Sequence, residues 1–366
     1  MELPVLGLDK AELKEPLVGK SRAELEVALA ELKQPAYRGR QIAQWLYARG
    51  ARSFADMTDQ PAALRERLAE RFEVGRSEIA ARQVSRDGTT KLLLRYPDGK
   101  EIETVVLPYP DRTSVCISSQ VGCAVGCVFC ATATMGFARN LSVGELVDQV
   151  LTAREQSPTG KLTHVVVMGM GEPMLNYENL VRALKLMHEE IGLSYRHLTV
   201  STAGHVPGIR KLAEEGLPVT LALSLHAPND ELRASLIPLS KKWGVQAVME
   251  AVREYLDKTG RRVTLEYLLL ARVNDEEEHA RQLGELCRGM ISHVNLIPWN
   301  PADSFTHFEA PGQKRVRRFR QIVEEYGISV TQRMERGQDI AAACGQLAVK
   351  AGEIAVAPRS FADLEA

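Results

Sequence analysis

The 366-residue sequence lacks the features of a membrane or exported protein. It contains no apolar run long enough to span a bilayer. Its first residues, "MELPVLGLDKAELKEPL", include early acidic residues and lack the basic start and apolar core of a signal peptide. We therefore expect a cytoplasmic protein that does not contact a membrane.

The sequence also has little net charge and few cysteines. The formal net charge is −1, so any binding of nucleic acid must use local basic patches. We do not expect the six cysteines to form a structural disulfide framework, because a reducing cytoplasm keeps thiols free. No tandem repeat or low-complexity tract is present. What the chain does have is 45% hydrophobic residues, enough for one large domain with a smaller one, or for two domains.

The first hundred residues change from helical patterns to strand patterns. Residues 21–32, 37–50 and 61–72 repeat apolar residues at helical spacing; Ser21 is a plausible N-cap, and Gly50 ends the second segment. Residues 78–108 show short apolar runs around "RDG" and "PDG" turns, which are typical of hairpins. We predict a helical accessory domain over residues 1–75 and a β-hairpin linker over 76–108, with a domain boundary near residues 95–105.

From residue 113 onward, strands alternate with helices. Six βα units begin at the strand patterns 113–119, 162–169, 197–202, 218–226, 261–270 and 291–299. The predicted fold class is α/β, with a six-unit core over 109–335 and a C-terminal segment over 336–366. Six such units could form an open doubly wound sheet or a partial barrel. In both, ligands bind at the carboxyl ends of the strands.

Five short motifs fall at those strand ends. They are "CAVGCVFC" (123–130), "MGMGEP" (168–173), "STAG" (201–204), "SLHA" (224–227) and "IPWNP" (297–301). Each motif alone is weak, because glycine-rich turns follow many strands. Together they predict a binding site on one rim of the sheet.

The three cysteines of "CAVGCVFC" allow three interpretations. They could be buried core residues, since free cysteine often packs in cores. They could supply three ligands of a structural zinc site with a distant fourth ligand. They could also hold an iron–sulfur cluster.

Cys-x3-Cys-x2-Cys after a first strand, with "GEP" after the second, resembles the radical S-adenosylmethionine (SAM) superfamily. This resemblance implies a partial (β/α)6 radical SAM barrel with a [4Fe–4S] cluster. Three thiolates leave one iron open, and SAM chelates that iron in the superfamily, whereas structural zinc and ferredoxin sites use four protein ligands. The implied cluster ligands are Cys123, Cys127 and Cys130.

A closer resemblance covers residues 36–350. The segments "YRGRQIAQWLYARG", "IETVVLP", "VVVMGMGEPMLNY", "SLHAPND", "VNLIPWNP" and "DIAAACGQL" are similar to the RlmN family of dual-specificity RNA methyltransferases. The family makes 2-methyladenosine in 23S rRNA, at the peptidyl transferase centre, and in tRNA, 3′ of the anticodon. The related enzyme Cfr methylates C8 of the rRNA adenosine. A C8 methyltransferase and a zinc-containing, non-enzymatic RNA-binding module are the alternative functions.

The resemblance implies a two-cysteine mechanism that uses two SAM molecules per turnover. Cys344 would become S-methylcysteine, and after hydrogen abstraction by a 5′-deoxyadenosyl radical its methylene group would add to C2 of adenine. Cys116 would help remove the C2 proton and then attack the sulfur of Cys344, leaving a transient disulfide. Without the resemblance, the favoured interpretation of both cysteines is that they are small buried core residues, the usual role of free cysteine. Cys287 matches nothing in the family and is expected in the core.

The remaining site residues also come from the resemblance. Glu103 would be a proton acceptor, with Glu101, two residues away, as its competitor. The implied SAM contacts are Gly171, Glu172, Ser201, Ser224, Leu225, His226 and Asn300; backbone groups of 224–226 would pair with SAM, and His226 would make contacts rather than act as a base.

The expected partners are 23S rRNA, tRNA and an external electron donor such as flavodoxin, and the expected state is a monomer. The basic run 314–321 and the arginines of 38–52 could hold phosphates, although a solvated helix face explains the first equally well. The target adenine must leave its surroundings to reach a buried site, and the N-terminal domain would clamp folded RNA by its shape.

Overall fold

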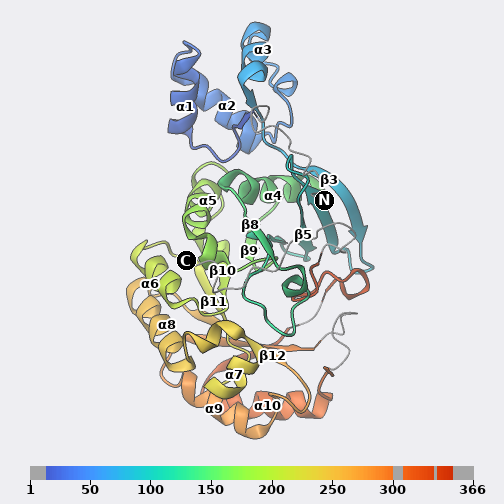
Figure 1. Ribbon diagram of the computed structural model, residues 1–366, viewed down its shortest axis with the longest axis vertical. Coiled ribbons are helices and arrows are strands. Elements are labelled where there is room, and N and C mark those ends of the chain that lie inside the picture. The colour runs from blue at the N-terminus through green and yellow to red at the C-terminus, as the bar shows by residue number, and fades with distance from the viewer. Residues whose placement is uncertain (1–13, 300–307, 334–335, 349–366) are drawn as a thin grey trace, which may run out of the picture.

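A single ten-stranded sheet forms the centre of the protein. The computed structural model describes residues 14–299, 308–333 and 336–348 (Figure 1). The strand order is β14-β13-β12-β11-β10-β9-β6-β5-β4-β3. Strands β3 to β6 pair antiparallel, and all pairs from β6 to β14 are parallel. Their bounds are β3 (Glu78–Val84), β4 (Thr90–Arg95), β5 (Glu101–Pro108), β6 (Thr113–Cys116), β9 (His164–Val167), β10 (Leu198–Thr202), β11 (Thr220–Ser224), β12 (Val263–Leu269), β13 (Ser292–Pro298) and β14 (Ser329–Gln332).

Helices cover the outer side of the parallel strands. Figure 1 shows them following one another around the sheet from α4 to α10. Parallel neighbours require such crossovers, and the predicted alternation of strands and helices is confirmed. The covering helices are α4 (Val143–Gln156), α5 (Tyr177–Glu189), α6 (Val206–Glu214), α8 (Val245–Thr259), α9 (Glu277–Cys287) and α10 (Gln313–Glu325). The short helix α7 (Asp230–Leu236) instead lies at the strand ends, where the carbonyl of Leu236 accepts from the amide of Val128.

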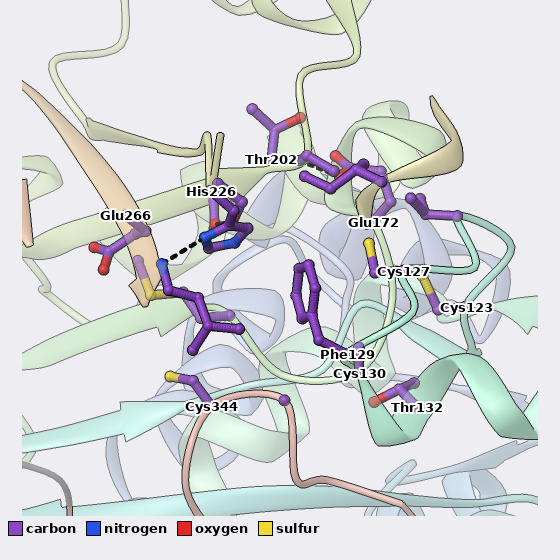
Figure 2. A pocket seen from close by; sticks show the side chains of 18 of the residues that line it. Cys123, Cys127, Phe129, Cys130, Thr132, Glu172, Thr202, His226, Glu266 and Cys344 are labelled. Carbon is purple, nitrogen blue, oxygen red and sulfur yellow. Dashed lines mark hydrogen bonds between the residues drawn. The ribbon is translucent and has the colours of Figure 1, made fainter. Parts of the chain in front are cut away.

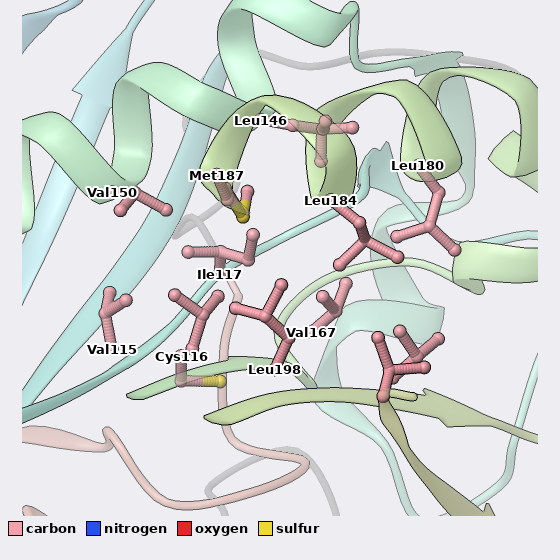
Figure 3. Packing of buried hydrophobic residues seen from close by; sticks show 14 of the residues in the cluster. Val115, Cys116, Ile117, Leu146, Val150, Val167, Leu180, Leu184, Met187 and Leu198 are labelled. Atoms are coloured by element: carbon pink, nitrogen blue, oxygen red, sulfur yellow. The ribbon is translucent and has the colours of Figure 1, made fainter. Parts of the chain in front are cut away.

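The packing of α4 and α5 on the sheet decides which way β6 presents its side chains. Val115 and Ile117 face these helices, whereas the sulfur of Cys116 lies on the other side of the strand (Figure 3). This follows from the alternation of side chains along a strand. Cys116 is therefore directed to the interior of the curved sheet. The facing helix residues include Leu146, Val150, Leu184 and Met187, all fully buried or nearly so.

A helical lobe precedes the sheet. It contains α1 (Arg22–Glu31), α2 (Tyr37–Ala43), a π-helical turn η1 (Gln44–Ala48), the short helix η2 (Phe54–Asp56) and α3 (Ala62–Arg71), with a small pairing of β1 (Glu15–Pro16) and β2 (Phe72–Glu73). Ser21 caps α1 in a capping box with Glu24, as its position predicts. The predicted helix over 37–50 is α2 continued by η1, and Gly50 follows with a positive φ of 71°.

A buried ion-pair network fixes this lobe to α4. The guanidinium of Arg76 lies 2.5 Å from Asp148 and 2.8 Å from Glu155, and it also donates to the carbonyl of Gly50. The side chains of Arg76 and Asp148 are 2% and 0% exposed. The junction is therefore a desolvated contact and not a loose linker.

Several elements differ from the sequence predictions. The hairpins of residues 78–108 belong to the central sheet, and the predicted boundary near residues 95–105 falls at the turn between β4 and β5, across which the sheet continues. The pattern also missed β14, α7 and a two-stranded pairing of β7 (Gln120–Gly122) with β8 (Phe137–Asn140). Strands of three or four residues offer too few alternations to recognise. Among the described residues, no helix has the length and apolar character needed to cross a membrane.

Candidate active site

A cavity lies at the carboxyl ends of the parallel strands, where the motifs predict a site. Figure 2 shows Cys123 and Cys127 on one side of it and Glu266 on the other, with the ring of Phe129 between. All three cysteines of residues 123–130, which we call the cysteine loop, line this cavity. The other predicted site residues in its wall are Gly171, Glu172, Ser201, Ser224, His226 and Cys344.

The cysteine loop is held at its start and in its middle. It follows β7 directly, and the amide of Cys123 donates to the carbonyl of Gly136 at 2.7 Å, just before β8. In its middle, the amide of Val128 donates to the carbonyl of Leu236 at 3.1 Å. These bonds keep the three thiols on one wall of the cavity.

The electrostatics of the loop suit a bound group that supplies positive charge. Burial raises the pKa of all three thiols, and for Cys127 the neighbouring thiols raise the pKa further, whereas Arg233 lowers it. Ionising these buried thiols costs free energy, and the positive charge of a bound metal centre would offset that cost. Within the described part of the chain, no three His, Cys, Asp or Glu residues converge as around a single metal ion. Three thiolates match a [4Fe–4S] cluster that leaves one iron open, whereas a structural zinc site takes four protein ligands, so the donor set of the loop fits the cluster better than zinc.

The "GEP" turn presents a fixed carboxylate. Gly171 has a φ of +101°, and a Cβ there would lie 2.6 Å from Cβ of Gln120, so the turn requires glycine. Glu172 is buried, and its two oxygens accept from the amides of Met174 at 3.0 Å and Ala203 at 2.7 Å. Burial raises the pKa of Glu172, while these amide hydrogen bonds lower it. Lone pairs remain on this carboxylate for a cationic ligand group such as an ammonium.

His226 is locked as a neutral donor. Its Nδ1 accepts from the amide of Leu268 at 2.9 Å, so the ring proton is on Nε2 (Figure 2). Its backbone φ is +56°, and its carbonyl accepts from the side-chain amide of Asn274 at 2.8 Å. Burial lowers the pKa of His226 to about 3. Because Nδ1 is occupied and Nε2 already carries its proton, the ring cannot act as a base at neutral pH.

The backbone of residues 224–226 is more engaged than we expected. The carbonyls of Ser224 and Leu225 both accept from the guanidinium of Arg233, and Leu225 is fully buried outside the cavity wall. The hydroxyl of Ser224 lies 3.4 Å from that of Ser201. A ligand at the ends of β10 and β11 would therefore meet the hydroxyls of Ser201 and Ser224 more than the backbone of residues 224–226.

Cys344 is common to two cavities. It lines the cavity of the cysteine loop and an adjoining one that also contains Cys116. The C-terminal segment is attached beside the cysteine loop, because the amide of Ala131 donates to Gly345 and the hydroxyl of Thr132 to Leu347, each at 2.7 Å. Burial and the neighbouring Cys344 raise the pKa of Cys116 to about 12. Cys287 lies in the core at the end of α9, as expected.

Glu103 and Glu101 occupy different environments. Glu103 is buried and lies 3.0 Å from the ammonium of Lys91, and its second oxygen has no partner among the described residues. Burial raises its pKa, and Lys91 lowers it. Glu101 pairs with Arg95 at 2.7 Å. Glu103 is in the wall of neither cavity, so its assignment stays a prediction. Asn300 lies outside the described residues.

Sequence reasoning missed three charged residues around the cysteines. Glu266 is buried in the cavity wall and accepts from Asn295 at 3.0 Å, and its second oxygen has no hydrogen-bond partner in the part of the chain that the structure describes. Arg333 lines both cavities next to Cys116 and Cys344. Arg233, fully buried, lies behind the wall. Glu266 could have been noticed as an isolated charge in the apolar strand pattern "RRVTLEYLLL".

The basic run 314–321 is largely paired within the protein. Arg315 forms ion pairs with Asp275 and Glu276, and Arg318 with Glu277. Its charges are thus partly neutralised by the acidic residues 275–277 at the start of α9, which favours the solvated-face interpretation.

Comparisons with known proteins agree with this geometry. Residues 117–283 match the radical SAM superfamily, and residues 16–74 match the ribosomal RNA large subunit methyltransferase N-terminal domain. A probable dual-specificity RNA methyltransferase RlmN from Symbiobacterium thermophilum is 48% identical over 342 residues, covering 92% of each chain. A protein of the same name from Gloeobacter violaceus is 48% identical, covering 91% of this chain and 94% of its own. The crystal structure of a radical SAM methyltransferase from Sphaerobacter thermophilus has a TM-score of 0.88 at 48% identity, covering 91% of this chain and 99% of that one.

The curved parallel sheet and its three-cysteine loop thus have the fold of a radical SAM methyltransferase. The likeness extends through the helical lobe and nearly the full length of the relatives. The chain belongs to the RlmN family.

Proposed function

We propose that this protein is a radical SAM RNA methyltransferase. It methylates C2 of an adenosine in the peptidyl transferase centre of 23S rRNA and of the adenosine 3′ of the anticodon in tRNA. The observation that carries the proposal is the position of Cys344, which lines one cavity together with the cysteine loop and the adjoining cavity together with Cys116. The names of the relatives and the match of the helical lobe support RNA as the substrate class.

The cofactor site follows from the wall of the first cavity. The three thiols of the cysteine loop would hold a [4Fe–4S] cluster, which with SAM supplies a 5′-deoxyadenosyl radical. Glu172 would accept from the SAM ammonium, since its carboxylate is already oriented by two amides. His226 would donate through Nε2, and the hydroxyls of Ser201 and Ser224 would meet the polar edges of SAM.

The two lone cysteines would perform the transfer. C2 of adenine is electron-poor and cannot attack a methyl donor as an amine does, so the carbon must be delivered to it. The sulfur of Cys344 would carry the methyl group and bond to the RNA through it. The RNA adduct would lose its C2 proton to Cys116 and one electron to the cluster, which restores the adenine ring. The Cys116 thiol would then give up its proton, and its thiolate would attack the sulfur of Cys344. The carbon–sulfur bond breaks, the released carbon takes up a proton to become the methyl group, and an external donor reduces the disulfide that remains. Arg333, beside both cysteines, favours the thiolate that this attack requires.

Nucleoside analysis tests the proposal. The anaerobically reconstituted protein is incubated with SAM, reductant and either a 23S rRNA fragment or tRNA, and the digested RNA is analysed by mass spectrometry. The expected product in both RNAs is 2-methyladenosine. If 8-methyladenosine is the main product, the protein is a C8 methyltransferase. If the protein binds one equivalent of zinc and no iron–sulfur chromophore forms, the proposal is wrong.

A further inference from the structure

Arg233 is a buried cation whose hydrogen-bond partners among the described residues are all neutral. It lies in α7, is 0% exposed, and is among the largest fully buried side chains. Its guanidinium donates to the carbonyls of Leu225 (3.0 Å), Ala203 (2.6 Å) and Ser224 (3.1 Å). It also donates to the hydroxyl of Ser240 at 2.6 Å. These four bonds tie the ends of β10 and β11 to the short helix η6 (Pro238–Lys241).

The nearby carboxylates do not neutralise it. Glu172 is held by the amides of Met174 and Ala203, and Asp230 accepts from the amide of Val245 at 2.5 Å. Within the described ranges, no carboxylate forms an ion pair with Arg233. Burial accordingly lowers the pKa of Arg233 to about 10, and the group that most opposes this shift is the thiol of Cys127. A buried unpaired charge is costly, so an anionic partner is expected close by.

The backbone around Arg233 is shaped to keep it there. Gly204 has a φ of +100°, and a Cβ at that position would lie 3.1 Å from Nη2 of Arg233 and 3.1 Å from Val248. The turn after β10 therefore packs directly against the guanidinium and has little room for a side chain at Gly204. The guanidinium lies directly behind Ala203 and Ser224, which are part of the cavity wall. The helix that carries it also contacts the cysteine loop, because the amide of Val128 donates to the carbonyl of Leu236 at 3.1 Å.

We propose that Arg233 is the counter-charge of the iron–sulfur cluster and raises its reduction potential. This inference rests on the proposed ligation of the cluster by the cysteine loop. Each electron that an external donor adds makes the thiolate-bound cluster more negative, and a fixed positive charge nearby stabilises the reduced state more than the oxidised state. Arg233 touches neither substrate nor cofactor in this role; it is a positioning residue that acts through the field at Cys127.

The experiment is a redox titration of reconstituted, SAM-free protein, followed by the electron paramagnetic resonance signal of the reduced cluster. Arg233→Gln removes the charge, and Arg233→Lys keeps it. We expect Arg233→Gln to lower the reduced-to-oxidised ratio at a fixed potential at least tenfold, equivalent to about 59 mV for one electron. Arg233→Lys should titrate close to the native protein.

A second pair of variants leaves Arg233 in place. Ser240→Asp puts a carboxylate against the guanidinium and neutralises it, whereas Ser240→Asn supplies a neutral group of nearly the same shape. The Asp variant should shift the potential in the same direction as Arg233→Gln, and the Asn variant should not. This pair decides the question even if Arg233→Gln fails to fold.

The outcomes separate the two proposals. If the native protein forms no cluster, the proposed function fails. If clusters form and the native protein, Arg233→Gln and Ser240→Asp all share one midpoint potential, Arg233 only braces the strand ends and this inference is refuted. If Ser240→Asn shifts the potential as much as Ser240→Asp, packing and not charge sets the potential, which refutes it equally.

Discussion

Replacing Cys116 by Ala should convert the protein into a trap for its own RNA substrate. Cys116 is 8% exposed, and truncating a small buried side chain costs about 1 kcal/mol, against typical domain stabilities of about 5–15 kcal/mol. The variant should therefore fold and keep its cysteine loop. Cys344 would still receive its methyl group and bond to RNA, but no second thiol would release the product.

The expected result is a covalent protein–RNA species that reaches at most one RNA per chain and then stops. Incubation with SAM, reductant and an rRNA fragment, followed by a denaturing gel, should show a shifted band that nuclease removes. Cys344→Ala should give neither this band nor methylated RNA. The asymmetry arises because one sulfur carries the carbon and the other only releases it.

Cys287→Ala is the matched control. Cys287 is also buried, at 1% exposure, but it lies in α9 and lines neither cavity. It should lose a similar amount of stability and turn over normally. Normal turnover by Cys116→Ala, or an adduct formed by Cys344→Ala, would refute the two-cysteine mechanism for this protein.

Three further predictions follow from the geometry of the site and the lobe. Replacing any one thiol of the cysteine loop by Ala should abolish reductive SAM cleavage, and full cleavage in any such variant would overturn the ligand assignment. Arg76→Met leaves the buried charge of Asp148 unpaired and should lower the free energy of unfolding by about 3–5 kcal/mol in urea melts. The exposed Arg315→Met should cost less than about 1 kcal/mol, and equal costs would show that the junction is not desolvated. The pKa of His226 is depressed from 6.5 to about 3, so the unfolded chain binds more protons below pH 6.5, and the folded state loses stability as pH falls. In urea melts of the cluster-free protein, the free energy of unfolding should be about 2 kcal/mol lower at pH 5 than at pH 7 because of this residue. The His226→Gln variant should lack this contribution. If native protein and variant show the same difference between the two pH values, the ring is protonated in the folded state.

The alternation of strands and helices could be predicted because each parallel strand from β9 to β13 is an apolar run bounded by turn residues. The position of the motifs at one edge of the sheet could also be predicted, because the carboxyl ends of parallel strands lie at the same edge. The shape of the cysteine loop could not be predicted, because the short strands β7 and β8 leave no periodic signal.

Arg233 shows a different limit of sequence reasoning. In "NDELRASL" it has the polar neighbours of a solvent-exposed helix, and no pattern marks it as buried. It is buried because the carbonyls of three residues from two strand ends converge on its guanidinium. That convergence depends on how β10 and β11 lie side by side, which is a property of the tertiary fold.

The attachment of the C-terminal segment has a consequence for the order in which the protein assembles. The hydroxyl of Ser85 donates to Asp339 across 254 positions of the chain, and Thr132 reaches Leu347 across 215. During synthesis, Cys344 leaves the ribosome only after every strand of the sheet has been made, and domains fold as the chain emerges. The wall that holds the cysteine loop can thus be complete while the cavity still lacks its last side.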